Sequence, residues 1–409
     1  MNPNAAPFAW LFDPVDAATF GREYFERATL HVSRNDPARF ANLYGVGDLE
    51  DALQLGAREA ANFALVKAGS PELAIEQYAP MRPSVRAAYT GKPPVTTIDP
   101  RKVAEFFEQG WTLVVKDASA FSARMQRFCN ALQAQTGWFV QPNVYFTPAS
   151  AQGFDVHYDT HGTLIAQIEG EKTWRVYKPV VELPLESQPF DAAAHADRLQ
   201  LDCEIPMQPG DTLYIPHGFP HHAASRGTRT LHVTFAMLTL RVADLLERML
   251  AAAALADVEL RRSLPPGWRD DPATAGALMR SLNDRLREVF AHDRLGPSGD
   301  RLALEFLGAS RIDASGSFAR VRASKAIAAT STIRWRGDLP YAISERGEAL
   351  ALLVPGRSLT LPAACAQALR RLRQGPVTVG ELPGLADVNQ LWFARVLLTY
   401  GVVDVDGPA

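Results

Sequence analysis

Residues Asn143–Pro179, NVYFTPASAQGFDVHYDTHGTLIAQIEGEKTWRVYKP, contain short runs of β-branched and aromatic residues divided by Gly, Pro, Asp and Ser. Runs of the same kind continue on both sides. Together they predict strands at residues 111–116, 139–147, 163–167, 173–176, 212–215 and 230–235. Several short strands with turn residues between them are typical of an antiparallel sandwich or barrel. The sequence therefore predicts a β-rich domain in this part of the chain.

Helical patterns occupy the regions around the predicted strands. Apolar residues recur at helical spacing in three long segments, residues 48–67, 242–258 and 273–292. Nearer the C-terminus, shorter helices are predicted at residues 362–374, after Thr378, where Glu381 completes a capping box, and at residues 387–400 before Gly401. Three short helices followed by the strand sequence VVDVD indicate a winged-helix arrangement.

We predict an α+β protein with three parts. Residues 1–240 form the β-rich domain with a helical N-terminal extension, residues 241–300 form a helical pair, and residues 301–409 form a winged-helix-like domain. The helical pair has an apolar face large enough to pack against a partner, so we expect it to mediate a homodimer.

Amino-acid composition and charge limit the kinds of partner that the protein is expected to bind. The 409 residues are 47% hydrophobic and 21% charged with a net charge of −3, which is typical of a globular protein with a sizeable core. Residues 361–409 hold four arginines against four acids. DNA affinity rests mainly on neutralising phosphates, so we expect no nucleic-acid partner and a protein-contact role for this last domain.

Composition also indicates the compartment. No stretch reaches the roughly 18 apolar residues that span a bilayer, and the start, MNPNAAPFAWLFDP, lacks the pattern of a signal peptide. Three cysteines lie far apart without a C-x-x-C motif, as suits a reducing cytosol. We therefore expect a cytoplasmic protein without membrane segments.

Two motifs predict a metal centre. On a strand, residues two apart share a face, so His157 and Asp159 in VHYDTHG present an imidazole and a carboxylate side by side. Residues 210–221 follow the spacing G-x5-P-x-G-x2-H, which resembles the second motif of the cupin superfamily and ends at His221. Two imidazoles and one carboxylate form the facial triad of non-haem Fe(II) oxygenases. A zinc hydrolase would accept the same ligands.

Lys172 discriminates between these two metals. It lies fifteen residues after His157, after a turn at Gly170 that brings the chain back toward the metal-bearing face. A buried ammonium group needs a counter-charge. If 2-oxoglutarate chelates iron through its 1-carboxylate and ketone, its distal carboxylate needs a cation inside the barrel, and Lys172 is the candidate.

Taken together, these residues resemble the JmjC oxygenases. The Asn143–Pro179 segment is similar to the metal-site segment of that family, particularly of the ribosomal oxygenases, and AQIEGEK also resembles the asparaginyl hydroxylase that acts on hypoxia-inducible factor. The resemblance implies a double-stranded β-helix (cupin or jelly-roll) core, followed by a helical dimerisation region and a winged helix. It also implies Fe(II), 2-oxoglutarate as cosubstrate and O2, with His157, Asp159 and His221 as iron ligands and Lys172 as the 2-oxoglutarate clamp.

Three further residues complete the predicted cosubstrate site. Asn143 either hydrogen-bonds a cosubstrate carboxylate or bridges strands, and Tyr145 either does the same or lines the substrate entrance. Thr234 lies where relatives often place a small polar group near the 1-carboxylate. His222, next to a ligand on the predicted strand, is expected to face away from the metal, and His217 is expected at the rim of the pocket.

The resemblance implies hydroxylation of an amino-acid side chain in a protein or peptide, and a ribosomal protein or a precursor peptide would both fit. One alternative keeps the cofactors and removes methyl groups from N-methyl-lysine. Another is a metal-binding cupin without oxygenase activity. A third, a DNA-binding regulator that uses the C-terminal domain, is disfavoured by the charge count.

Overall fold

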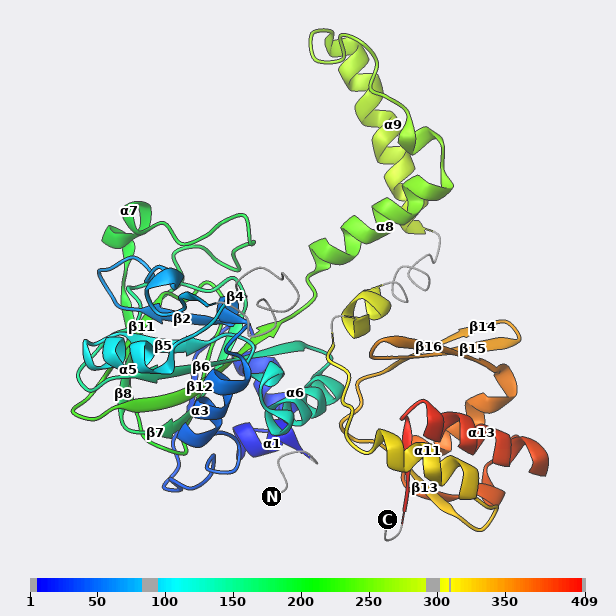
Figure 1. Ribbon diagram of the computed structural model, residues 1–409. Coiled ribbons are helices and arrows are strands. Elements are labelled where there is room, and N and C mark those ends of the chain that lie inside the picture. The colour runs from blue at the N-terminus through cyan, green and yellow to red at the C-terminus, as the bar shows by residue number, and fades with distance from the viewer. Residues whose placement is uncertain (1–5, 83–94, 292–301, 309, 407–409) are drawn as a thin grey trace. The chain divides into compact units, whose positions relative to one another are not determined.

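The chain forms two compact units, Met1–Thr239 and Leu240–Ala409 (Figure 1). The structure is a computed structural model that describes residues 6–82, 95–291, 302–308 and 310–406. Within these ranges, no helix combines the length and the apolar composition that a bilayer crossing requires.

The first unit is built on a large sheet in which every neighbouring pair of strands is antiparallel. Its strands, in spatial order, are β1 (Leu30–Val32), β10 (Thr212–Ile215), β7 (Gly162–Glu169), β12 (Thr230–Leu238), β6 (Phe139–Thr147), β5 (Thr112–Val115) and β2 (Phe63–Val66). β12 lies between β6 and β7 along almost its whole length. This central position places β12 and its neighbours around the site described below.

A smaller antiparallel sheet packs on the large one. Its spatial order is β11 (His221–Ser225), β8 (Lys172–Tyr177) and β9 (Leu201–Met207). Ile165 and Leu213 of the large sheet share one buried apolar cluster with Trp174, Val176 and Met207 of the small sheet. The two antiparallel sheets pack over a shared core, in agreement with the antiparallel sandwich or barrel that the sequence predicts, and are called the barrel below.

Helices cover the other side of the large sheet. The first unit contains α1 (Pro7–Phe12), α2 (Ala17–Thr19), α3 (Val46–Leu55), α5 (Pro100–Glu108), α6 (Ala123–Thr136), α7 (Ala192–His195) and the short strand pair β3 (Met81–Arg82) and β4 (Val95–Thr96). α6 begins at Ser122, whose hydroxyl accepts a hydrogen bond from the backbone of Met125, and ends at Gly137 with φ +73°. Phe128 of α6 contacts Phe235 of β12, so this helix seals the core beneath the sheet.

The predicted strands are confirmed as β5, β6, β7, β8, β10 and β12. The predicted helix over residues 48–67 is wrong in its second half, because α3 ends at Leu55 and residues 63–66 form strand β2. All four residues of β2 are buried, and pairing with β5 satisfies their backbone groups. Burial in a sheet has therefore overridden a local helical spacing.

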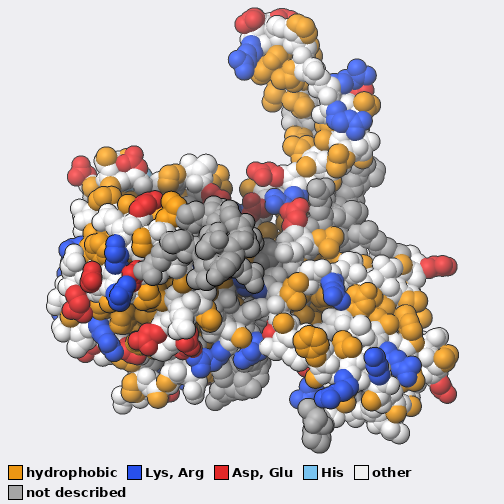
Figure 2. Space-filling model, viewed as in Figure 1, with side chains coloured by type: hydrophobic (Ala, Val, Ile, Leu, Met, Phe, Trp, Pro, Cys, Tyr) orange, Lys and Arg blue, Asp and Glu red, His pale blue; other side chains and the backbone are white. Residues whose placement is uncertain are grey.

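The second unit begins with the two predicted helices, observed as α8 (Val242–Ala256) and α9 (Pro272–Ala291); His292, included in the prediction, lies outside the described residues. An ion pair of 3.5 Å between Arg285 of α9 and Asp257 joins the second helix to the end of the first. Figure 2 shows hydrophobic side chains along the surface of this pair.

The rest of the second unit has its own apolar core. It contains helical residues 302–308, α11 (Ser317–Ala326), β13 (Thr332–Trp335), β14 (Ala342–Arg346), β15 (Ala349–Val354), β16 (Arg357–Pro362), α12 (Ala366–Arg373), β17 (Val377–Thr378), α13 (Asp387–Thr399) and β18 (Val403–Val405). The strands form two antiparallel sheets, β17-β13-β18 and β14-β15-β16.

Two of the three predicted C-terminal helices are confirmed as α12 and α13, and Gly401 after α13 has φ +71° as expected. The prediction of the middle helix, after Thr378, is wrong. Residues Val379–Glu381 form a single 3-10 turn, and the Thr378 side chain makes no capping bond. The backbone of Val379 and of Gly380 donates instead to the Ser331 and Ala329 carbonyls, which ties this segment to the start of β13.

Candidate metal centre

His157 and His221 are brought together by their own backbones. The His157 amide donates to the His221 carbonyl at 3.2 Å, and the His221 amide donates back at 2.7 Å. His221 is the first residue of β11, whereas His157 forms only this isolated bridge, so the strand predicted around His157 is not formed. The Gly218 amide also donates to the Asp159 carbonyl at 2.9 Å, which holds the two motifs side by side.

Both imidazole rings are fixed through the same ring nitrogen. Nδ1 of His157 lies 2.8 Å from the Asp155 carbonyl oxygen, and Nδ1 of His221 lies 2.9 Å from the Phe219 carbonyl oxygen. Because a carbonyl only accepts, each Nδ1 carries the proton and each Nε2 keeps a free lone pair. Burial lowers the pKa of His221 to about 4, and the adjacent His157 adds to this shift, so His221 is neutral near pH 7.

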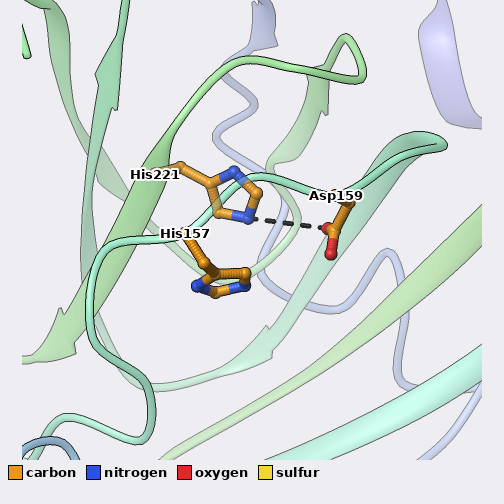
Figure 3. A group of neighbouring side chains, drawn as sticks. All are labelled: His157, Asp159 and His221. Atoms are coloured by element: carbon orange, nitrogen blue, oxygen red, sulfur yellow. Dashed lines mark ion pairs between the residues drawn. The ribbon is translucent and has the colours of Figure 1, made fainter. Parts of the chain in front are cut away.

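Asp159 completes the group (Figure 3). One of its carboxylate oxygens lies 3.7 Å from Nε2 of His221 and accepts a hydrogen bond of 2.9 Å from the Thr163 hydroxyl. Burial alone would raise the pKa of this carboxyl, but the facing imidazoles, above all His221, lower it overall. One ligand atom from each of His157, Asp159 and His221 lies within 4.8 Å of the other two. The two imidazoles and the carboxylate therefore fit one divalent ion.

These three side chains line a cavity of about 260 Å3 inside the barrel. The remaining residues of its wall are Thr112, Tyr145, Gly153, Phe154, Thr163, Lys172, Trp174, His222, Ala223, His232 and Thr234. The wall thus includes three of the four predicted cosubstrate residues, Lys172, Tyr145 and Thr234.

Lys172 is almost wholly buried in this wall, with 4% of its surface exposed. Its ammonium group donates to the Thr147 hydroxyl at 3.2 Å and lies 5.8 Å from the centre of the Trp174 ring. Among the described residues, no acidic side chain forms an ion pair with it. Burial accordingly lowers the pKa of Lys172 to about 7. A cation so placed favours an anionic ligand in the cavity.

Asn143 does not line the cavity, although it lies on β6 with Tyr145. Its side-chain oxygen accepts a hydrogen bond of 3.0 Å from the backbone of Asp117, two residues after β5 ends. This bond joins β6 to the turn after β5, so it is closer to the predicted strand-bridging role of Asn143 than to a cosubstrate contact. His217 is buried but does not line the cavity either.

The cavity wall also contains two histidines that were not predicted to line it. His232 was not predicted, yet it is only 2% exposed, its ring stacks on Tyr145 with 4.9 Å between centres, and its Nδ1 has no partner among the described residues. Its position two residues before Thr234 on one strand is a signal that could have identified it. His222 lies opposite Arg175 on the strand register, on the other face of β11 from His221 as predicted, but it also lines the cavity, and its Nε2 is 3.3 Å from the Tyr177 hydroxyl.

Residues 115–245 match the family model described as the JmjC domain, and most strands of the two antiparallel sheets lie within this segment, which is therefore similar to a JmjC domain. Over 267 residues the chain is 33% identical to ribosomal oxygenase 1 of Gallus gallus, covering 63% of this chain and 42% of the relative. Against the Brugia malayi protein named bifunctional lysine-specific demethylase and histidyl-hydroxylase NO66 it is 29% identical over 274 residues, covering 64% and 36%.

The chain spans less than half the length of these curated relatives. Among solved structures, the Escherichia coli ribosomal oxygenase YcfD, determined with cobalt and 2-oxoglutarate, covers 96% of this chain with 99% of its own. The TM-score is 0.54 and the sequence identity 15%, a likeness that establishes the fold.

Proposed function

We propose that this protein is an Fe(II)- and 2-oxoglutarate-dependent oxygenase that hydroxylates an amino-acid side chain in a protein or peptide. The observation that carries the proposal is the pairing of two features in one cavity: a two-histidine, one-carboxylate group, and a buried lysine without an acidic partner among the described residues. When bound, Fe(II) with 2-oxoglutarate and O2 would supply oxidation, converting 2-oxoglutarate to succinate and CO2 while one oxygen atom enters a substrate C–H bond.

The chain's own residues would hold the reactants. His157, Asp159 and His221 would hold the ion and leave coordination positions for cosubstrate and O2. The Lys172 ammonium would pair with the distal carboxylate of 2-oxoglutarate, and Thr234 and Tyr145 would contact its remaining oxygens. Thr163 would keep the Asp159 carboxylate oriented through its hydrogen bond.

Lys172 is the residue that favours this chemistry over that of a metal-binding cupin without oxygenase activity. A zinc hydrolase needs only the metal and a bound water, and gains nothing from an ammonium group in the wall. A dicarboxylate that chelates the metal at one end needs a cation for its other end. The buried ammonium supports the second arrangement.

The substrate class follows from the relatives. Proteins named ribosomal oxygenase 1 are similar to 63% and 64% of the chain, which supports a ribosomal protein as substrate. A second candidate is N-methyl-lysine demethylation, favoured by the name of the Brugia malayi relative and by three aromatic rings, Tyr145, Phe154 and Trp174, in the cavity wall. Release of formaldehyde from a methylated peptide would mark demethylation, whereas a stable product heavier by one oxygen atom would mark hydroxylation.

The second unit would mediate the assembly of the protein into a dimer. The α8 and α9 pair exposes apolar side chains, with Leu246 42%, Leu250 43% and Met279 57% exposed, which supports a dimerisation element. The α11–β18 region would act as a winged-helix-like domain for protein contact, without nucleic acid. A cytoplasmic location agrees with the three unpaired cysteines.

Turnover of 2-oxoglutarate tests the proposal. Purified protein with Fe(II) and O2 should convert 2-oxoglutarate to succinate slowly without a second substrate, and faster with a host ribosomal-protein fraction. Mass spectrometry of that fraction should then reveal a protein heavier by one oxygen atom. Absence of succinate in every iron-loaded preparation would contradict the assignment.

A further inference from the structure

The metal cavity lies on one face of the small sheet, and a groove lies on the opposite face of that sheet. Along β8, Lys172 and Trp174 line the metal cavity, whereas Thr173 and Arg175 line a separate groove of about 230 Å3. This alternation follows from the pleat of the strand, in which successive side chains point to opposite faces. The groove therefore lies on the outside of the barrel wall whose inside forms part of the metal cavity.

His222 joins the groove to the cavity, because it lines both. On the strand register, His222 of β11 lies opposite Arg175 of β8, and Arg175 lies opposite Glu204 of β9. These three side chains thus form a row across the outer face of the sheet, starting at the edge of the metal cavity.

The loop before His157 also borders both the metal cavity and the groove. Gln152 lines the groove and Phe154, two residues later, lines the cavity. Gln152 pairs with Ala224 of β11 as an isolated bridge, and its side-chain nitrogen donates to the Phe154 carbonyl at 2.8 Å. An extended chain that leaves the metal cavity past His222 and Phe154 would therefore enter the groove.

The groove has an excess of positive charge. Arg175 and Arg226 line it together with a single acid, Glu204. The Arg175 guanidinium donates to Glu204 at 2.7 Å, so this pair is internally compensated. Arg226 is exposed and forms no ion pair within the described part of the chain. One guanidinium at the groove thus remains available for a carboxylate.

We propose that this groove is a substrate subsite that binds an acidic residue, Asp or Glu, at a fixed distance in sequence from the residue that is oxidised. Arg226 pairs with the carboxylate of that residue, and the Arg175–Glu204 pair fixes the far side of the groove. The inference rests on the proposed function, which it extends from a peptide substrate in general to one with an acidic flank.

A pool of peptides from a host proteome tests the subsite with the full-length protein. The pool is incubated with Fe(II), 2-oxoglutarate, O2 and wild type, Arg226→Glu, Arg226→Gln or Arg58→Glu protein. Arg58 is a matched control, since it is exposed in the same unit and is absent from both the groove and the cavity. Peptides heavier by one oxygen atom are then sequenced by mass spectrometry.

We expect wild-type products to share an Asp or Glu at one offset from the oxidised residue. Arg226→Glu should lower kcat/KM for these peptides at least tenfold and raise it for peptides with Lys at that offset, Arg226→Gln should lower it less, and Arg58→Glu should match wild type. No shared acid in wild-type products, or the same preference in Arg226→Glu, would overturn the subsite.

Conversion of 2-oxoglutarate to succinate without peptide distinguishes a failure of the proposed subsite from a failure of the proposed oxygenase function. Arg226→Glu should retain the wild-type rate of that reaction, because Arg226 does not line the metal cavity. If wild type forms succinate but oxidises no peptide in the pool, the subsite is wrong while the cofactor assignment stands. If wild type forms no succinate, the oxygenase assignment fails and the subsite with it.

Discussion

At the scale of single residues, the chain around the candidate metal centre mainly orients the three candidate ligand side chains. Two backbone carbonyls set the tautomers of His157 and His221, and Thr163 holds one oxygen of Asp159. Each of the three side chains thus offers one candidate ligand atom within 4.8 Å of the other two. Residues that hydrogen-bond the candidate ligands, such as Thr163, should therefore affect metal affinity measurably.

Removal of the Thr163 hydroxyl tests that expectation. Thr163→Val preserves the shape of a side chain that is 2% exposed but removes its hydrogen bond to Asp159. We expect Fe(II) affinity to fall about 10- to 100-fold, measured by anaerobic titration. Thr230→Val is the control, because Thr230 is also buried and its hydroxyl has no partner in the described ranges. Equal affinities of the two variants would contradict the role given to Thr163.

Lys172 should determine cosubstrate affinity without affecting the metal. Lys172→Met should weaken 2-oxoglutarate binding by about 10- to 100-fold, since a charge-assisted hydrogen bond contributes about 1.5–3 kcal/mol. Isothermal titration of the Fe(II)-loaded protein measures the change, and Lys178→Met, at an exposed lysine, serves as control. An unchanged dissociation constant for 2-oxoglutarate would favour the cupin without oxygenase activity.

The same lysine predicts a pH dependence. Its pKa in the free protein is lowered to about 7 by burial, so it is charged below pH 7 and increasingly neutral above it. Because the carboxylate requires the charged form, binding above pH 7 must take up a proton. We expect the dissociation constant of 2-oxoglutarate to be flat below pH 7 and to rise about tenfold per pH unit above it, a slope that Lys172→Met should lose.

At the scale of the elements, the turn between β10 and β11 positions His221. Gly218 has φ +83°, and a Cβ added there would lie 2.7 Å from the Val181 carbonyl oxygen. We expect Gly218→Ala to lower the free energy of unfolding by about 1–3 kcal/mol, measured with denaturant. In Gly227→Ala, at φ +65° in open space, only the backbone strain applies, so a smaller loss is expected. Equal losses would exclude the steric contact as the cause.

The elements also show what sequence alone can predict. β6 and β10 follow from runs of β-branched and aromatic residues, and the observed bounds equal the predicted ones. β11, with the sequence HHAAS, has no such run, and its pairing with β8 forms it. Spacing identified the three candidate ligands and Lys172, and all four residues line one cavity. The bond from the Asp117 backbone to Asn143 depends on distant segments meeting, which no local pattern encodes.

At the scale of the whole molecule, the exposed apolar face of α8 should be covered in solution if the protein is a dimer. Leu246 and Leu250 lie one turn apart, both more than 40% exposed. The double variant Leu246→Glu with Leu250→Glu should be monomeric by sedimentation at concentrations where wild type is dimeric. Leu55→Glu, at a leucine 71% exposed in the first unit, should remain dimeric. A monomeric wild-type protein would contradict the dimer proposal.

Anaerobic titration with Fe(II) and then 2-oxoglutarate probes the proposed centre itself, because an iron-bound 2-oxo acid gives a visible charge-transfer band. Wild type should bind one Fe(II) per chain and develop the band when 2-oxoglutarate is added. His221→Ala should do neither, and Lys172→Met should require more 2-oxoglutarate for the same band. An Fe(II)-loaded wild type without the band, or a band undiminished in His221→Ala, would contradict the oxygenase assignment.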